Sequence, residues 1–133
     1  MQPKRLKNRE QFQAVLACAP VARTEHFAMH SLDLGAGVPA QPAFAAPGPW
    51  IGALVPKRWA RRAVTRNLIR RQVYALAAGS AGWQPQCAYV VRLRSAFDLR
   101  QFPSASSDAL KTAVRTELQR LFQRATCPVR PAA

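Results

Sequence analysis

Apolar residues recur along the chain with two periods, and the period predicts the type of each element. Near the N-terminus, Phe12, Val15 and Leu16 share one face of a helix expected over residues 8–17. Asn8 can cap this helix, since Gln11 stands at the capping-box position. A longer stripe of the same period predicts a helix over residues 107–124, with an apolar face made of Leu110, Val114, Leu118, Leu121 and Phe122.

Three shorter segments have the alternation or the continuous apolar run that is typical of strands: residues 26–34, 51–55 and 87–93. The last of these, CAYVVRL, is the strongest, because Tyr and Val favour strands. In the first segment, alternation puts Phe27 and Met29 on one face and both His26 and His30 on the other.

Residues 57–78, between the second and third strands, contain neither Pro nor Gly and are rich in Arg, Ala and Leu, which predicts a helix. Gly79 ends it. At about 100° per residue, Arg62, Arg66 and Arg70 form one ridge, with Asn67 and Arg71 in a second ridge beside it. The opposite side, expected to be buried, carries Val64 and Leu68, with Ile69 and Val73 at its margin.

The order of the expected elements is helix, strand, strand, helix, strand, helix. This order predicts an α+β protein, a small sheet with helices packed on one face. Residues 1–124 are expected to form a single domain, and residues 125–133, with Pro128 and Pro131, are expected to form a frayed tail. Residues 35–49 are rich in Gly, Pro and Ala and are expected to form a flexible surface loop.

The charge of the chain sets it apart from an average globular protein. Twenty Lys and Arg stand against six Asp and Glu, a formal net charge of +14. Such a charge repels itself in the folded state, and its usual partner is a polyanion. No apolar run is long enough to span a membrane, and the basic N-terminus lacks the apolar segment of a signal peptide, so we expect a cytoplasmic protein without a membrane partner.

Much of this charge lies in the segment RRAVTRNLIRR, residues 61–71, and no acid occurs between Asp33 and Asp98. Like charges four residues apart destabilise a helix by about 0.2–0.5 kcal/mol per pair. A helix that was merely solvated would interleave Glu, whereas guanidinium groups chelate phosphate through paired hydrogen bonds. The segment therefore predicts nucleic-acid binding, either RNA or DNA. The candidate residues are Lys57, Arg58, Arg61, Arg62, Arg66, Asn67, Arg70 and Arg71.

Other candidates for chemistry are weaker. Phe12 and His30 could stack on unpaired bases, although a Phe on an amphipathic helix is more often a core residue. His26 and His30 could form a metal or acid–base pair, but the acids nearest in the sequence, Glu25 and Asp33, stand singly and show no recognised metal-ligand spacing, so this interpretation is the weaker one. The six acids form no cluster, so the chain is interpreted as a binder and not as a complete enzyme, with no metal site of its own.

Four segments, in order, resemble the bacterial ribonuclease P protein component. KRWARRAVTRNLIRRQV is similar to that family's Arg-Asn-Arg helix signature, and RLKNREQFQAVL is similar to its opening Arg-Leu-Lys followed by a helix that carries a Phe. IGALVPK and CAYVVRLRSA resemble the strands on either side of the basic helix. The resemblance covers residues 4–124, and the ordered set is far more specific than any one motif.

The resemblance implies a ribosomal protein S5 domain 2-like fold, a small α/β sandwich with a left-handed βαβ crossover around the basic helix. It implies the protein subunit of a ribonucleoprotein endoribonuclease, in which a catalytic RNA subunit holds Mg²⁺ and hydrolyses precursor tRNA at the end of its 5′ leader. The protein would bind the catalytic RNA through its Arg-Asn-Arg face, and the leader in a cleft beside the first helix.

Matched position by position, Arg66 and Asn67 take the first two signature positions, and Arg70 and Arg71 the basic pair that follows. Lys57 and Arg58 match the basic residues after the strand. Phe12, Leu16 and His30 match positions of the leader cleft. The chain departs from the signature at Leu68 and Tyr74, which stand where basic residues are common.

Two other functions remain as alternatives. An RNA-binding structural protein of ribosomal type would share the basic helix but would not need leader-cleft residues. A DNA-binding helix-turn-helix module would need a second helix just before the basic one, where this chain has a Pro-rich segment and the strand IGALV.

Overall fold

The computed structural model describes residues 3–34, 44, 49–79, 83, 84, 86–97 and 107–126. The six expected elements are present, and two further strands, β1 and β2, join them. In chain order the elements are β1 (Lys4–Arg5), α1 (Arg9–Leu16), β2 (Pro20–Arg23), β3 (Phe27–Asp33), β4 (Trp50–Leu54), α2 (Ala63–Ala78), β5 (Cys87–Leu93) and α3 (Asp108–Thr126). Most of the loop expected over residues 35–49, and residues 127–133 of the expected tail, lie outside the described residues.

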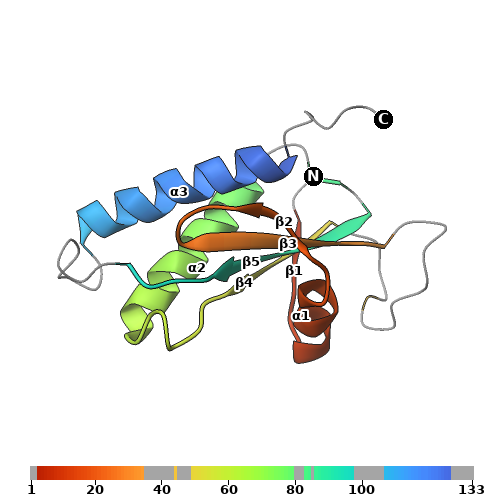
Figure 1. The fold of residues 1–133 in the computed structure, drawn as a ribbon, viewed down its shortest axis with the longest axis horizontal. Helices are drawn as coiled ribbons and strands as arrows, with labels where there is room; N and C mark the ends of the chain where they lie inside the picture. The colour runs from red at the N-terminus through yellow and green to blue at the C-terminus, as the bar shows by residue number, and fades with distance from the viewer. Residues whose placement is uncertain are drawn as a thin grey trace.

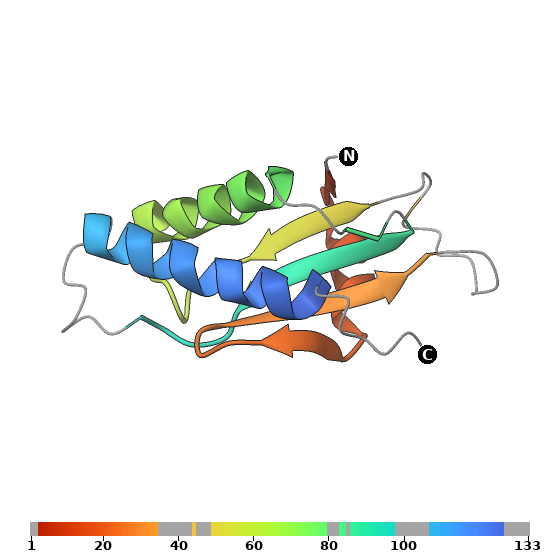
Figure 2. The same cartoon turned by 90° about the horizontal axis from the view of Figure 1, so that it is seen from above.

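The five strands form one mixed sheet in the order β1-β4-β5-β3-β2. Strands β1, β4 and β5 are parallel, while β3 is antiparallel to both β5 and β2. Helix α2 makes the connection between β4 and β5. Seen from the helix side with these strands pointing up, β5 lies to the left of β4 (Figure 2), so the crossover is left-handed, as the resemblance implies.

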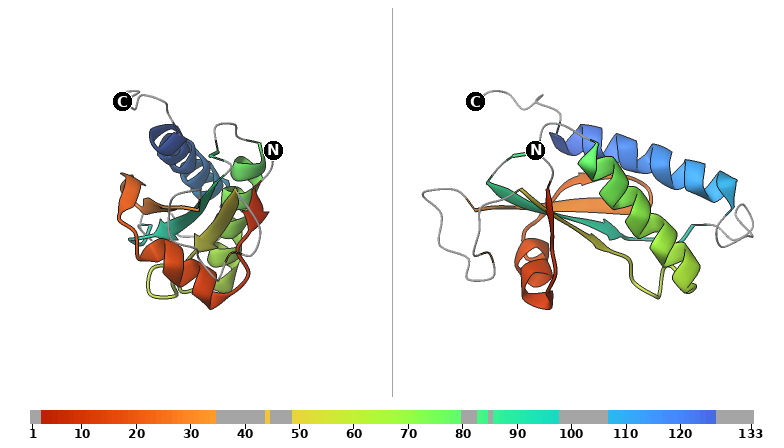
Figure 3. Two further views of the ribbon diagram at one scale, coloured as in Figure 1. Left: turned by 90° about the vertical axis from the view of Figure 1, so that its right-hand side faces the viewer. Right: turned by 180° about the vertical axis from the view of Figure 1, so that it is seen from behind.

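The sheet separates two layers of helices, which confirms the α+β class. Helices α2 and α3 cover one face, and α1 lies on the opposite face (Figures 1 and 3). The expectation that the helices pack on one face is therefore wrong for α1. Both faces of the central strands are apolar: Met29 and Val91 point to α2 and α3, whereas Ala88 and Val90 lie with Val15 of α1. We call the side covered by α1 the α1 face.

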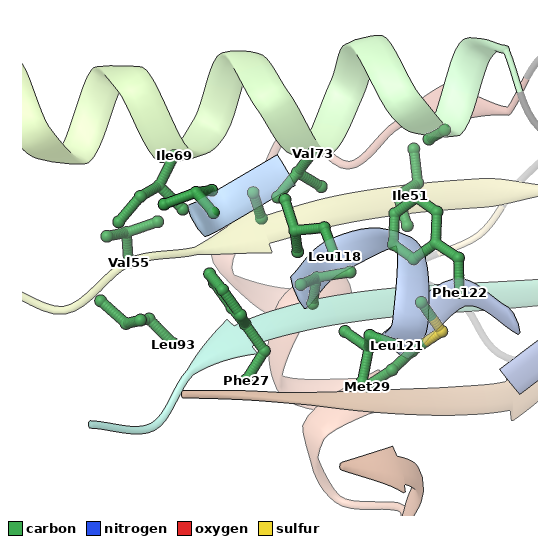
Figure 4. Close-up of a cluster of buried hydrophobic side chains, with 14 of the residues drawn as sticks. Phe27, Met29, Ile51, Val55, Ile69, Val73, Leu93, Leu118, Leu121 and Phe122 are labelled. Carbon is green, nitrogen blue, oxygen red and sulfur yellow. The ribbon is translucent and has the colours of Figure 1, made fainter. Parts of the chain in front are cut away.

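The main core lies between the sheet and the pair α2 and α3 (Figure 4). Ile69 and Val73 of α2 are at most 1% exposed, and each such burial contributes about 1.5–3 kcal/mol. The prediction that Val64 belongs to the buried side of α2 is wrong, since its exposed fraction is 55%. Helix α2 packs against both β4 and α3, so its buried stripe is centred on Ile69 and Val73, which had been placed at the margin.

Local signals explain most of the helix ends. Asn8 Oδ1 accepts from the Gln11 backbone N–H at 2.9 Å, and Gln11 Oε1 accepts from the Asn8 N–H, so the expected capping box is confirmed. Gly79 follows the last residue of α2 as expected. The predicted start of this helix at residue 57 is wrong. The backbone N–H groups of residues 59 and 60 both donate to the Pro56 carbonyl, which makes a turn, and α2 begins at Ala63.

Candidate RNA-binding surfaces

The first basic residues of the candidate set lie in the segment that leads into α2. Lys57, Arg58, Arg61 and Arg62 are all exposed, and the Arg58 guanidinium lies 5.2 Å from the centre of the Trp59 ring. Arg62 is the N-cap residue of α2 but makes no side-chain capping bond. The guanidinium group of Arg62 is therefore available for a partner in solution.

Arg66, in the second turn of α2, has a partly structural role. It is half-buried, and its Nη1 donates to the Ala60 carbonyl at 3.0 Å and to the Arg61 carbonyl at 2.7 Å. These carbonyls lie in the turn before the helix, where the backbone has no helical partners for them. Arg66 therefore holds the basic segment 57–62 against α2.

The next residues of the signature, Asn67, Arg70 and Arg71, are held together on one side of α2. Asn67 Oδ1 accepts from Arg70 Nη1 at 2.9 Å, which orients that guanidinium group. All three residues line a depression of about 560 Å³ beside β1, to which Arg5 and Tyr74 also contribute. The guanidinium groups of Arg5, Arg70 and Arg71 thus surround one depression, an arrangement that suits the binding of a phosphate.

Arg5 and Tyr74 were missed as site residues by the sequence analysis. The Arg5 guanidinium lies 4.2 Å from the centre of the Tyr74 ring, within cation–π distance. The Tyr74 hydroxyl in turn accepts from the Ala53 backbone N–H at 3.2 Å. The tyrosine therefore attaches α2 to β4 and supports Arg5. Only the pairing of β1 with β4 brings Arg5 beside α2, and a two-residue strand has no periodic signal.

A second depression, of about 310 Å³, lies along the same helix on the side of α3. Asn67 and Arg71 line this depression too, and Lys111 of α3 lies across from them. We call the surface formed by Arg5, Asn67, Arg70, Arg71 and Lys111 the arginine face.

In the part of the chain that the structure describes, no carboxylate forms an ion pair with the arginines of α2. The ion pairs among the described residues are His26 with Glu25 and Glu117, and the exposed pair Lys111–Asp108 at 3.9 Å. An exposed pair of this kind contributes only about 0–1 kcal/mol. The arginine face is thus strongly positive, and a polyanion that approaches it meets little competition from the protein's own acids.

Phe12 and Leu16, predicted for the leader cleft, lie on the α1 face. Both are half-buried and pack on the small cluster formed by Leu6, Val15, Ala88 and Val90. The Phe12 ring lies directly on Gly52 of β4: a Cβ at that position would be 2.7 Å from Phe12 Cε1. The missing side chain of Gly52 therefore makes the space in which the ring sits.

His30 lies on the same face but is only 6% exposed. Its Nδ1 is 2.7 Å from the Cys18 carbonyl oxygen, and its Nε2 is 3.4 Å from Nε of Arg92 on β5. The structure therefore places His30 as a buried, hydrogen-bonded residue and not as an exposed ring. Arg92 did not stand out in the sequence, since a single Arg inside an apolar strand has no pattern of its own.

His26 does not share the face of His30, so the prediction that the two lie together is wrong. His26 precedes β3, in the turn after β2. Its Nδ1 is 2.7 Å from Glu117 Oε1 of α3, and its ring stacks on Phe97 at a centroid distance of 3.9 Å. Glu117 also accepts from the Thr24 hydroxyl, so this carboxylate holds the turn to α3.

Two thiols are described, and both are free and half-buried. Burial raises the pKa of the Cys87 thiol, and the nearby Asp33 carboxylate adds to that effect. Cys87 is thus a neutral packing residue at physiological pH. Cys127 lies outside the described residues.

The fold and the two surfaces define a class: a small α+β protein whose uncompensated arginine face and aromatic α1 face suit it to bind RNA. Within the described residues, none of the helices combines the length and apolar character needed to cross a bilayer.

A family model described as Ribonuclease P matches residues 1–126, and the chain belongs to the family of ribonuclease P protein components. This family serves the 5′ maturation of tRNA together with an RNA subunit.

Relatives and solved structures agree with this assignment. The ribonuclease P protein component of Paraburkholderia xenovorans is 31% identical over 125 residues, which cover 91% of this chain and 79% of that protein. The protein from Ralstonia pickettii is 32% identical over 128 residues, with coverages of 94% and 81%. The structure of the Staphylococcus aureus RNase P protein superposes with a TM-score of 0.60 at 16% identity, over 90% of this chain and 92% of the other, and so supports the fold.

Proposed function

We propose that this chain binds the catalytic RNA of ribonuclease P through its arginine face and the 5′ leader of precursor tRNA on its α1 face. The RNA subunit then performs the hydrolysis, and the protein raises the affinity for precursor tRNA over mature tRNA. The observation that carries the proposal is the separation of two different surfaces. Along α2 lie arginines that have no ion pair with any described carboxylate, and an aromatic ring is seated on the opposite side of the sheet.

The arginine face is suited to a folded RNA for electrostatic and geometric reasons. Arg71 is exposed, and Arg70 is oriented by Asn67, so their guanidinium groups can each donate two parallel hydrogen bonds to a phosphate, which ammonium groups cannot do. Binding releases counterions from the RNA, which makes the affinity fall steeply with salt. The segment 57–62, held to α2 by Arg66, extends the same charge beyond the helix.

The α1 face is suited to a single strand. Proteins bind unpaired nucleotides by combining apolar or aromatic platforms with nearby cations. Phe12 and Leu16 supply the platform, and Arg92 lies on the same face beside His30.

We assign the Mg²⁺ of the reaction to the RNA subunit and not to the described part of this chain. Among the described residues, no three His, Cys, Asp or Glu side chains gather where they could hold a metal ion. These residues therefore do not fit a magnesium site, and the proposal leaves Mg²⁺ to the RNA subunit. The chain contributes cations that reduce the repulsion between two RNA molecules. We place this activity in the cytoplasm, where bacterial tRNA is made.

The test is cleavage of a precursor tRNA by a bacterial ribonuclease P RNA at low magnesium, with and without this chain. The RNA alone should be nearly inactive there, and the chain should restore a single cut at the mature 5′ end. If the chain binds both RNAs and restores no cleavage, an RNA-binding structural protein of ribosomal type becomes the better description.

A further inference from the structure

The hydrogen bonds of His30 assign a role to each of its two ring nitrogens. A carbonyl oxygen only accepts, so the contact of 2.7 Å with the Cys18 carbonyl requires a hydrogen on Nδ1. The Arg92 guanidinium is always protonated, so its Nε donates, and His30 Nε2 at 3.4 Å must accept. His30 therefore donates from Nδ1 and accepts at Nε2, and it connects the residues after α1 to a cation on β5.

Arg92 is an unusual cation, because it is half-buried and no carboxylate within the described ranges forms an ion pair with it. Alternation along β5 puts it on the α1 face with Ala88 and Val90, between Leu54 of β4 and Ala28 of β3. Among the described residues, His30 is its hydrogen-bonding partner, and no carboxylate pairs with it. The contact uses Nε and leaves both terminal nitrogen atoms of the guanidinium group to bind an anion.

We propose that Arg92 binds a phosphate of the leader strand and that His30 is the positioning residue that holds its guanidinium group in place. The inference rests on the proposed function, because it assumes that the single strand lies on the α1 face. We assign the phosphate to the leader and not to the catalytic RNA, because Arg92 lies on the opposite side of the sheet from α2 and on the same side as Phe12. His30 thus acts through Arg92 and not by stacking on a base.

Two substitutions of His30 separate positioning from simple packing. In His30→Asn, the amide N–H can replace Nδ1 and keep the bond to the Cys18 carbonyl, but no acceptor reaches Arg92. In His30→Gln, the longer side chain brings its oxygen near the position of Nε2 and keeps an acceptor for Arg92, while the bond to Cys18 is lost. A packing role predicts that the Asn variant is the better substitute, and a positioning role predicts the opposite.

The experiment measures the affinity of the reconstituted holoenzyme for precursor and mature tRNA. We expect Arg92→Ala to lower the preference for the precursor about tenfold, as the loss of one charge-assisted contact would. It should also reduce the salt dependence of leader binding by about 0.7 in the log–log slope, as the release of one fewer counterion would. His30→Asn should approach the same values, and His30→Gln should stay near the original protein. The double variant His30→Asn/Arg92→Ala should be no worse than Arg92→Ala alone.

Arg120→Ala, which removes an exposed charge from α3, is the matched control and should leave the precursor preference unchanged. Thermal unfolding of each variant shows whether it is folded, and Arg92→Lys retains the charge if the alanine variant is unstable. The inference is overturned if His30→Gln loses as much as His30→Asn, or if the two losses add in the double variant. If the original chain itself shows no preference for the precursor, the proposed function fails and not only the role of Arg92.

Discussion

Substitution of Gly52 by alanine tests the seat of Phe12 on the α1 face. The added Cβ would lie 2.7 Å from Phe12 Cε1 and 2.8 Å from Leu6 Cδ1. Carbon atoms in ordinary contact are about 3.5–4.0 Å apart, so the ring must withdraw by roughly 1 Å. Such overpacking costs about 1–3 kcal/mol. For a domain of this size we expect the melting temperature to fall by roughly 4 °C for each kcal/mol.

The measurement is thermal and urea unfolding followed by circular dichroism, with Gly79→Ala as the matched control. At Gly79 the nearest atom to an added Cβ is the Ala75 carbonyl oxygen at 3.7 Å, and φ is −90°, so alanine fits without strain. That control should remain within about 0.5 kcal/mol of the original protein.

A double variant connects the cost to the ring. Phe12→Leu removes the ring atoms that the new Cβ would meet, so the pair Gly52→Ala/Phe12→Leu should lose about 1 kcal/mol less than the sum of the single losses. Because Phe12 belongs to the proposed leader platform, Gly52→Ala should also lower the preference for precursor over mature tRNA. The reasoning is refuted if Gly52→Ala is as stable as Gly79→Ala, or if the two single losses are simply additive.

Three further outcomes are expected. Arg71→Glu should weaken binding to the catalytic RNA at least tenfold in a filter-binding titration, because about two good phosphate contacts are replaced by repulsion. Arg120→Glu on α3 should weaken this binding far less, and equal losses for the two variants would count against the arginine face. Glu117→Ala leaves the donors of Thr24 and His26 without their acceptor and should lower the free energy of unfolding by about 2–4 kcal/mol, while Glu117→Gln should lose less. Because burial raises the pKa of Cys87, the folded state favours the neutral thiol. The contribution of Cys87 to the free energy of unfolding is therefore complete below the unfolded-state pKa of about 8.5 and declines as the pH rises past that value. In urea titrations at increasing pH, a Cys87→Ala variant should lack this part of the decline.

The elements with strong periodicity could be predicted from the sequence, because their own residues determine them. The stripe from Leu110 to Phe122 gave α3, and the Asn8–Gln11 pair gave the start of α1. Strands β1 and β2 had no comparable signal. Strand β1 has two residues that are paired by the backbone of β4, and β2 starts at Pro20 and contains a register shift. Their structure depends on long-range pairing that no local pattern encodes.

The candidate site was predictable to a similar extent. The density of arginine identified α2 as a binding helix, but the helical wheel could not show which side would meet β4 and α3, and so Val64 was misplaced. Arg5 and Lys111 enter the arginine face only through the tertiary fold. His30 was identified from its position, yet its burial and its bond to Arg92 depend on the neighbouring strand.

The hydroxyl of Tyr74 has a consequence for the protein before it meets RNA. Strand β1 ends at Arg5, so none of the described strands lies beside Ala53 at the outer edge of β4. An open strand edge can pair with another chain. The tyrosine occupies the Ala53 N–H that an incoming strand would need. At the other edge, the Arg124 guanidinium of α3 occupies the Arg23 carbonyl of β2. Tyr74 and Arg124, which join the helices to the sheet, therefore also block two backbone groups through which another chain could add to the sheet edges in the absence of RNA.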